Sequence, residues 1–387
     1  MERIAGEYVP GSLAGSRYQA YVPKPLPPRP ALSFGPELLA SLERANQALG
    51  RLDGITLMLP DPDLFLYQYV RKEALLSSQI EGTQSSLSDL LLFELDEAPG
   101  VPMDDVEEVS NYVGALNHGL KRIRKDDFPL SLRLIREIHA VLLRGGRGSN
   151  KTPGEFRTTQ NWIGGRAPTM ASFVPPPPER LNQCLRDFEK FLHAPPEQMS
   201  PLIKAALAHV QFETIHPFND GNGRIGRLLI ALILCMENVL REPTLYLSLF
   251  FKTHRQQYYD QLDAVRKTGN WEAWLAFFLD GVESTSQQAV ATAQRVLELF
   301  DADREKVRTL GRRAGNVMQV FEQFARRPIL DGPALRKALR LTAPTVLAAV
   351  DALHRLKLIN EITGQRRNRI WVYEGYYNLL SEGAAPL

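Results

Sequence analysis

Apolar residues recur at every third or fourth position through most of the chain, and this spacing is typical of amphipathic and buried helices. The pattern predicts a series of helices in the first three hundred residues, including a short one capped by Ser86. The longer predicted helices cover about residues 37–53, 61–80, 104–123, 131–143, 179–193, 201–215 and 224–239, and helical spacing returns across 246–300. This part of the chain is therefore expected to be nearly all α.

Two segments of this part depart from the helical pattern. Residues 1–35 are rich in proline and aromatic side chains, and we expect them to lie extended on a surface without forming an element. Residues 156–165, FRTTQNWIGG, combine β-branched and aromatic residues and close on a Gly-Gly turn, which predicts a strand. The prolines at 175–178 then prevent a helix from starting before about residue 179.

The last seventy-five residues have a different order of elements. Helices are predicted near 316–324, 334–338 and 344–356, and the strand-like runs KLINEI and IWVYE then flank the basic turn TGQRRNR. Three helices followed by a hairpin with a charged tip are typical of a winged helix-turn-helix domain. Thr342 is expected to cap the helix that would read DNA in such a domain.

Composition and charge narrow the class of protein. The 387 residues include 46 Lys and Arg against 44 Asp and Glu, so the chain as a whole is not strongly basic, although residues 304–369 carry fifteen basic and five acidic side chains. Cys184 and Cys235 lie in helical apolar patterns without metal-ligand spacing, which favours reduced core thiols. No export signal is recognisable, and the longest apolar run, 228–236, is about half a membrane span. We therefore expect a cytoplasmic protein with no membrane partner.

A charged and glycine-rich stretch, HPFNDGNGRIGR at 216–227, lies between two predicted helices. Gly221 and Gly223 allow a sharp turn and a close approach to a ligand. The free N–H groups at the start of the following helix favour the binding of an anion. Arg224 and Arg227 lie on one face of that helix's first turn, so both guanidinium groups can reach one polyphosphate.

Two further side chains of this stretch add reactive chemistry. His216 ordinarily titrates near neutral pH and is suited to accepting a proton. Asp220 is a plausible Mg²⁺ ligand, since that ion usually takes one or two carboxylates plus phosphate oxygens. Taken singly, each residue has a structural alternative: the histidine as a hydrogen-bonded structural side chain, the glycines as a tight turn, the arginines as a solvated face, and Phe218 as core. Only their combination argues for chemistry.

The stretch resembles the signature of the Fic family, H-x-F-x-[DE]-G-N-G-R-x-x-R, at every fixed position. The matching residues are His216, Phe218, Asp220, Gly221, Asn222, Gly223, Arg224 and Arg227. The resemblance covers nearly the whole chain and implies a mainly α fold, with a Fic helical bundle, a β-hairpin flap and a C-terminal winged helix-turn-helix. The implied parts are an N-terminal helical region with an inhibitory helix at 1–108, a Fic catalytic core at 109–285, a linker helix at 286–310 and a winged helix-turn-helix domain at 311–387.

The resemblance implies a protein adenylyltransferase, which transfers AMP from ATP, with Mg²⁺, to a Tyr, Thr or Ser hydroxyl of a target protein. His216 would take the proton of that hydroxyl, Asp220 would hold Mg²⁺ against the α- and β-phosphates, and Arg227 would grip the γ-phosphate. The implied ATP site comprises Gly221, Asn222, Gly223, Arg224, Ile225, Gly226 and Arg227. Relatives that transfer phosphocholine or UMP leave the donor open, although the intact motif favours a nucleoside triphosphate.

A second motif, SSQIEG at 77–82, ends the helix predicted over 61–80. By itself it is a helix C-terminus with a glycine cap. In a Fic-like chain it resembles the family's inhibitory motif, which implies that Glu81 pairs with Arg227 and that ATP then binds with its α-phosphate misoriented. Some relatives also use this glutamate to help remove AMP, so a second role stays open.

Two more assignments rest on the resemblance. Residues 156–165 resemble the family's flap, whose exposed edge would hold a target segment by strand addition, and the alternative is an ordinary surface hairpin. Tyr258, Tyr259 and Arg266 fall near the position where relatives contact adenine, and the alternative is that these aromatic residues are core.

The C-terminal part suggests a function of a different class. Its basic side chains lie on the predicted second helix, the following turn and the wing tip: Arg336, Lys337, Arg340, Arg366, Arg367 and Arg369. Basic wings commonly contact DNA phosphates, so a nucleotide-sensing, DNA-binding transcriptional regulator is the alternative to the enzyme. The predicted recognition helix is mostly apolar, which argues against strong base-specific contact and leaves dimerisation or target docking open. A homodimer and self-modification are further possible associations.

Overall fold

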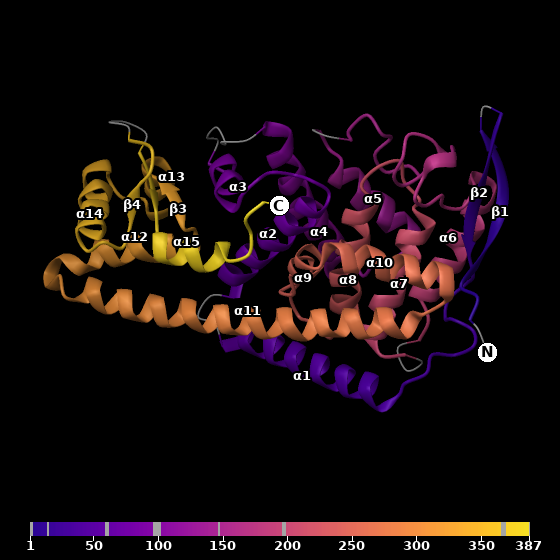
Figure 1. The fold of residues 1–387 in the computed structure, drawn as a ribbon. Coiled ribbons are helices and arrows are strands. Elements are labelled where there is room, and N and C mark those ends of the chain that lie inside the picture. The colour runs from indigo at the N-terminus through magenta and orange to yellow at the C-terminus, as the bar shows by residue number, and fades with distance from the viewer. Residues whose placement is uncertain are drawn as a thin grey trace.

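The computed structural model describes residues 3–13, 15–58, 62–95, 102–145, 148–195, 199–364 and 369–386. Figure 1 shows a larger helical body and a smaller C-terminal module, joined by the long helix α11 (Trp271–Arg308). The predicted mainly α fold class is confirmed. The wing-tip residues Arg366 and Arg367 lie outside the described ranges.

The helical body forms where the apolar spacing predicts it. Its helices are α1 (Pro36–Met58), α2 (Pro62–Ile80), α3 (Leu87–Phe93), α4 (Met103–Lys125), α5 (Leu132–Leu142), α6 (Pro178–Leu192), α7 (Pro201–Ile215), α8 (Asn222–Met236), α9 (Ser248–Thr253) and α10 (Arg255–Thr268). Ser86 caps α3 as predicted, in a capping box with Asp89. α7 is buried along nearly its whole length and packs against α8, whose first fourteen residues are almost all buried. The loop between these two helices is therefore held rigidly from both sides.

The N-terminal segment folds into a β-hairpin, so the expectation that residues 1–35 form no element was wrong. Strands β1 (Gly6–Leu13) and β2 (Ser16–Pro23) pair antiparallel. Tyr21 is buried, and its backbone N–H donates to the Val174 carbonyl at 2.9 Å. The strand is thus stabilised by a segment 153 positions away along the chain, which local spacing does not reveal.

The described residues 156–165, predicted as a strand, form none. Ile163 makes an isolated antiparallel bridge with Phe173, and this bridge is all that remains of the expected hairpin flap. The backbone ahead of the bridge is held by side chains instead, since Arg157 donates to carbonyls of the α7–α8 loop. Because those contacts replace ladder hydrogen bonds, β-branched composition alone is misleading here.

α11 is 38 residues long and continues without a break across residue 285, where the boundary between core and linker was expected. α1 packs along it, as Figure 1 shows. The stretch expected to be a linker helix is the second half of α11, and it carries the chain from the body to the C-terminal module.

The C-terminal module contains the predicted helices and strands. Its elements are α12 (Ala314–Arg326), β3 (Ile329–Asp331), α13 (Gly332–Leu339), α14 (Ala343–Arg355), β4 (Asn360–Glu361), β5 (Ile370–Val372) and α15 (Glu374–Ser381). The described strands form an antiparallel sheet in the order β3-β5-β4. Thr342 caps α14 by accepting from the Thr345 N–H, as predicted. α15 was not predicted, and it returns the chain from this sheet to the helical body.

The two cysteines are buried and unbonded, as expected of core thiols. Burial raises the pKa of Cys184 to about 11 and that of Cys235 to about 12, so both thiols stay protonated. Within the described ranges, no helix has both the length and the apolar character needed to cross a membrane.

Candidate active site

The α7–α8 loop begins where His216 ends α7 in a left-handed conformation, with φ 48° and ψ 60°. Its N–H still donates to the Phe212 carbonyl at 2.9 Å, and its own carbonyl accepts from Arg157 Nε at 2.9 Å. The buried Arg157 guanidinium also bonds to the carbonyls of Thr159, Ile215 and Pro176. Arg157 therefore caps α7 and holds the histidine in this conformation.

The His216 imidazole is neutral at physiological pH. Burial lowers the pKa of His216 to about 4, and the nearby charges of Arg157 and Arg266 act in the same direction. The Glu213 carbonyl acts in the opposite direction, and within the described ranges no residue forms a hydrogen bond with the buried Nδ1. A neutral imidazole has one unprotonated ring nitrogen, which can accept a proton.

His139 of α5 braces the loop, and the sequence reading missed it. Its ring stacks on Phe218 with centroids 3.7 Å apart and planes 6° from parallel. The Gly154 N–H donates to Nδ1 at 2.8 Å, so Nε2 carries the proton and donates to the Asp220 carbonyl at 3.0 Å. Burial lowers the pKa of His139 to about 4, so the ring stays neutral, with Nε2 as its donor and Nδ1 as its acceptor. The only sequence signal was a lone histidine in an apolar helix.

The N-terminus of α8 presents free backbone N–H groups to this loop. Gly221 precedes the helix with φ +75°, a conformation that glycine adopts without strain. Among the described residues, no side chain caps α8, since the N-cap residue Gly221 has none and the Asn222 side chain bonds to the N–H and the carbonyl of Phe218, both at 2.9 Å. The N–H groups at the helix start thus stay available to an anion.

Asp220 and Arg224 lie together beside this helix start. The side chain of Asp220 is 32% exposed, and one of its oxygens accepts from the Gly221 N–H at 2.6 Å. Arg224 is buried and reaches Asp220 at 3.6 Å and Glu108 at 3.2 Å. Thr83 donates to the same Glu108 oxygen at 2.9 Å, so the Arg224 guanidinium is fixed from behind.

The expected ion pair between Glu81 and Arg227 is present. Arg227 Nη2 donates to Glu81 Oε1 at 2.7 Å, and Nε and Nη2 also bond to the hydroxyl and carbonyl of Ser77 at 2.9 and 3.0 Å. Burial acts to raise the pKa of Glu81, but the charge and the hydrogen bond of Arg227, together with the charge of Arg224, outweigh it and the pKa is lowered. A Cβ at Gly223 would stand 2.2 Å from Glu81 Oε1, so only glycine admits the carboxylate this close to α8.

A second buried carboxyl, Glu213, lies behind Arg227 and was not singled out from the sequence. Burial raises the pKa of Glu213 to about 7, against the lowering effect of Arg227. Its Oε1 lies so near Gly226 that a Cβ there would approach to 2.3 Å. Arg227 is thus close to two carboxyl groups, and it bonds to Glu81.

The three residues suggested for adenine occupy different environments. Tyr258 is 1% exposed, and its hydroxyl bonds to His209 at 2.8 Å within an aromatic cluster, which favours the core alternative for this residue. Tyr259 is 39% exposed on the same helix. The Arg266 guanidinium lies over the Phe173 ring at 4.0 Å, next to the bridged loop.

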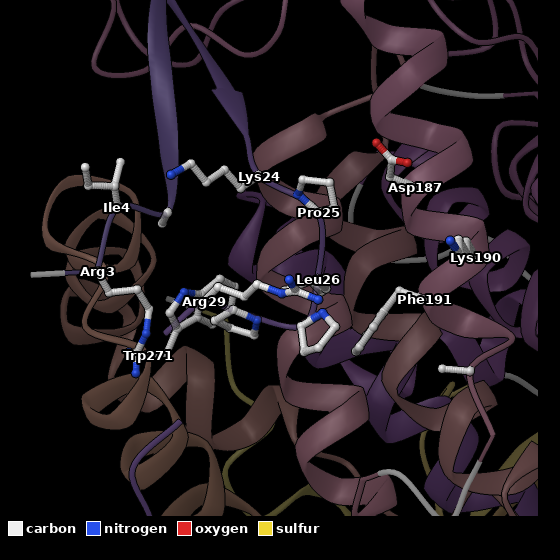
Figure 2. Close-up of a pocket in the computed structure, with 14 residues that line it drawn as sticks. Arg3, Ile4, Lys24, Pro25, Leu26, Arg29, Asp187, Lys190, Phe191 and Trp271 are labelled. Atoms are coloured by element: carbon white, nitrogen blue, oxygen red, sulfur yellow. The ribbon is translucent and has the colours of Figure 1, made fainter. Parts of the chain in front are cut away.

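A cavity of about 550 Å³ lies away from the motif, and Figure 2 shows its lining side chains. Lys24, Arg29 and Lys190 stand around it, with Phe191 and Trp271 among its apolar walls. None of the motif residues lines this cavity.

Comparison with known proteins finds two family regions in the chain. Residues 39–121 match the Fic/DOC family N-terminal region, and residues 129–234 match the Fic/DOC family. The chain thus contains these two Fic/DOC family regions, consecutive along 39–234. The motif, the loop and its flanking helices α7 and α8 lie at the end of the second region.

The relatives include named enzymes. The chain is 33% identical over 212 residues to the protein adenylyltransferase Fic of Culex quinquefasciatus, covering 53% of this chain and 39% of the relative. It is 29% identical over 240 residues to that of Nematostella vectensis, covering 59% and 52%. The chain thus spans about half or less of the length of these curated relatives.

Two crystal structures share the fold. A Fic family protein from Desulfovibrio desulfuricans G20 aligns with TM-score 0.58 and 18% identity, over 89% of this chain and 98% of that one. A Fic domain-containing signaling protein from Bacteroides thetaiotaomicron aligns with TM-score 0.50 and 18% identity, over 66% and 95%. The first alignment extends well beyond the two family regions.

Proposed function

We propose that this chain is a protein adenylyltransferase, which transfers AMP from Mg·ATP to a Tyr, Thr or Ser hydroxyl of a target protein. The observation that carries the proposal is the neutral His216 imidazole beside the free N–H groups of α8 and the Arg224 and Arg227 guanidinium groups. A base, a helix N-terminus with free N–H groups and two arginines thus lie within the single stretch 216–227, as transfer from a triphosphate would require. The names of the relatives support this chemistry.

In the proposed reaction, His216 accepts the proton of the target hydroxyl as its oxygen attacks the α-phosphorus. The bond from that phosphorus to the bridging oxygen breaks, and pyrophosphate leaves. The N–H groups of α8 and Arg224 would stabilise the charge on the phosphates, and Arg227 would hold the γ-phosphate so that attack is in line.

Asp220 suits the Mg²⁺ that accompanies ATP. Its side chain is partly exposed and stands beside the anion nest, as a ligand shared with phosphate oxygens must. In the described part of the chain, no cluster of three or more His, Cys, Asp or Glu forms a separate metal site. A single carboxylate therefore fits an ion brought in with the nucleotide better than a resident one.

We also propose that Glu81 inhibits the enzyme, which would make this a member of the class with an N-terminal inhibitory helix. The 2.7 Å ion pair occupies the arginine that the γ-phosphate would need. The Glu81 carboxylate also lies against the α8 start at Gly223, where it repels the phosphates of an incoming nucleotide. ATP would bind in a productive orientation only after Glu81 moves.

We also propose a role for each of four parts of the chain. The inhibitory region is proposed at 1–108 and the catalytic core at 109–285. A linker helix is proposed at 286–310 and a winged helix-turn-helix domain at 311–387. The order of helices and strands in the C-terminal module supports the last of these. Tyr259 and Arg266 are proposed to lie near the adenine of ATP. The proposed partners are DNA and a second copy of the chain, and the chain is also proposed to modify itself. The proposed location is the cytoplasm.

The proposal is tested by incubating the full chain with α-labelled ATP and Mg²⁺ and following label in protein. Wild type should incorporate little, Glu81→Gly should incorporate strongly, and adding His216→Ala to that variant should abolish incorporation. The acceptors offered are the hydroxyl side chains of the variant itself and of the proteins in an added extract. If Glu81→Gly then incorporates no label, the proposed activity is falsified.

A further inference from the structure

The end of the helix that carries Glu81 is fastened to the segment that follows α15. Gln79 lies two residues before Glu81 and is 1% exposed. Its Nε2 donates to the Ser85 carbonyl at 2.8 Å and to the Ala384 carbonyl at 3.0 Å. The Gln79 backbone carbonyl in turn accepts from the Gly82 N–H at 3.0 Å, so Gln79 belongs to the turn that presents Glu81.

Lys252 of α9 completes the contact from the other side. Its Nζ donates to Gln79 Oε1 at 2.7 Å and also to the Ala385 carbonyl. Lys252 is 6% exposed, and burial lowers its pKa. A buried ammonium group needs its acceptors, so Lys252 holds Gln79 and Ala385 together.

The segment 382–386 is itself held in a defined conformation. Glu382 makes two hydrogen bonds to Arg295 of α11, at 2.8 and 2.9 Å. Gly383 takes φ +75° and lies so close to Leu249 of α9 that a Cβ would approach to 2.9 Å. Ala384 is 3% exposed. These contacts place the Ala384 and Ala385 carbonyls at the end of α2.

The same segment is continuous with the sheet of the C-terminal module. α15 begins two residues after β5, and Tyr373 between them donates its hydroxyl to Asp303 of α11 at 2.5 Å. The Tyr373 N–H donates to the Pro328 carbonyl next to β3 at 2.7 Å. Only the short helix α15 separates β5 from segment 382–386, so a shift of β5 would move α15 and this segment with it.

We propose that residues 382–386 act as a latch through which the C-terminal module controls the Glu81–Arg227 ion pair. The inference rests on the proposed adenylyltransferase and deepens it by naming where inhibition is relieved. With the latch closed, Gln79 holds the end of α2 and Glu81 stays on Arg227. Displacement of β5 or α15 withdraws the two carbonyls, the end of α2 loosens, and Glu81 leaves Arg227 more often.

Two full-length variants open the latch without touching the active site. Lys252→Met removes both ammonium hydrogen bonds, and Glu382→Lys, at a partly exposed position, replaces the pair with Arg295 by a repulsion between two cations. Each should raise the initial rate of AMP transfer about tenfold over wild type, a coupling in the usual range between linked sites. Neither should raise it further in a Glu81→Gly background, because the latch acts through Glu81. Lys121→Met, an exposed lysine of α4, is the control and should leave the rate unchanged.

Hydrogen exchange of residues 77–82 provides a readout that does not depend on activity. Exchange there should quicken in both latch variants and stay at the wild-type rate in Lys121→Met. If neither variant changes exchange at 77–82 or the transfer rate while Glu81→Gly is active, the latch is wrong. If Glu81→Gly itself transfers no AMP, the proposed function fails, and the exchange measurement still decides whether residues 382–386 hold the end of α2.

Discussion

Replacing Glu81 with glutamine keeps the side chain's shape and removes the charge that faces Arg227. The oxygen and nitrogen of this pair are 2.7 Å apart, with Arg227 2% and Glu81 35% exposed at the side chain. The Ser77 hydroxyl and carbonyl remain as acceptors for Arg227 in the variant. The substitution therefore tests the ion pair itself, with little change in packing.

The size of the effect follows from the geometry. At an effective dielectric constant of about 20, two unit charges about 4 Å apart attract by about 4 kcal/mol. Solvent at the exposed side of Glu81 reduces this value, since fully exposed pairs contribute only about 0–1 kcal/mol. We take ~1–3 kcal/mol for this pair, which corresponds to a roughly 5–150-fold change in the fraction of molecules with Arg227 free.

Two measurements should move in opposite directions. The initial rate of AMP incorporation by Glu81→Gln should rise about tenfold or more, because Arg227 becomes available to the γ-phosphate. The free energy of unfolding, from urea denaturation at pH 7, should fall by ~1–3 kcal/mol, because a buried cation loses its partner. Glu7→Gln, on the exposed face of β1, is the matched control and should change neither.

A variant that loses stability without gaining activity would refute the reasoning, since the ion pair would then be structural only. A variant that gains activity with no loss of stability would show that the pair contributes nothing to the fold. The first result would remove Glu81 as an electrostatic inhibitor, and the second would remove the ion pair from the account of stability.

Three further substitutions test how the loop is held. His139→Leu leaves the Gly154 N–H and the Asp220 carbonyl unpaired. Steady-state kinetics in a Glu81→Gly background should show a roughly tenfold lower kcat/KM for Mg·ATP, and urea denaturation should show a free energy of unfolding lower by ~2–4 kcal/mol. Arg157→Lys keeps the charge but cannot bond four carbonyls at once. The rate of AMP transfer should fall by about a hundredfold, while the affinity for Mg·ATP, measured by titration calorimetry, should change much less. Burial raises the pKa of Glu213 to about 7, so the contribution of this carboxyl to stability is lost as pH rises from about 4.5, where it ionises in the unfolded chain, to about 7. The difference in free energy of unfolding between wild type and Glu213→Gln should therefore fall over this range, and parallel pH profiles of the two proteins would contradict the prediction.

Features set by local sequence could be predicted from the sequence. The glycine cap at Gly82 and the serine cap at Ser86 have side chains or conformations that act within a few residues. The Glu81–Arg227 pair joins residues 146 positions apart, and it was predictable only because a family resemblance supplied the contact. Composition and spacing alone would have left both residues as ordinary helix-end charges.

Features set by distant contacts could not be predicted in this way. β2 depends on a hydrogen bond from Tyr21 to Val174, and Arg157 finds its acceptors at the far end of α7. His139 acts through Asp220, 81 positions away. Each of these residues has an ordinary local context, so its role appears only when the loop it contacts is seen folded.

The most direct test of the central claim separates nucleotide binding from transfer. In a Glu81→Gly background, His216→Ala should bind Mg·ATP in titration calorimetry with a dissociation constant within about threefold of the parent, because the phosphates are held by α8 and the arginines and not by the imidazole. Mass spectrometry of the same samples should find AMP on protein with the parent and none with the His216→Ala variant. AMP addition that persists without the imidazole, or a parent that takes up no Mg·ATP, would contradict the account.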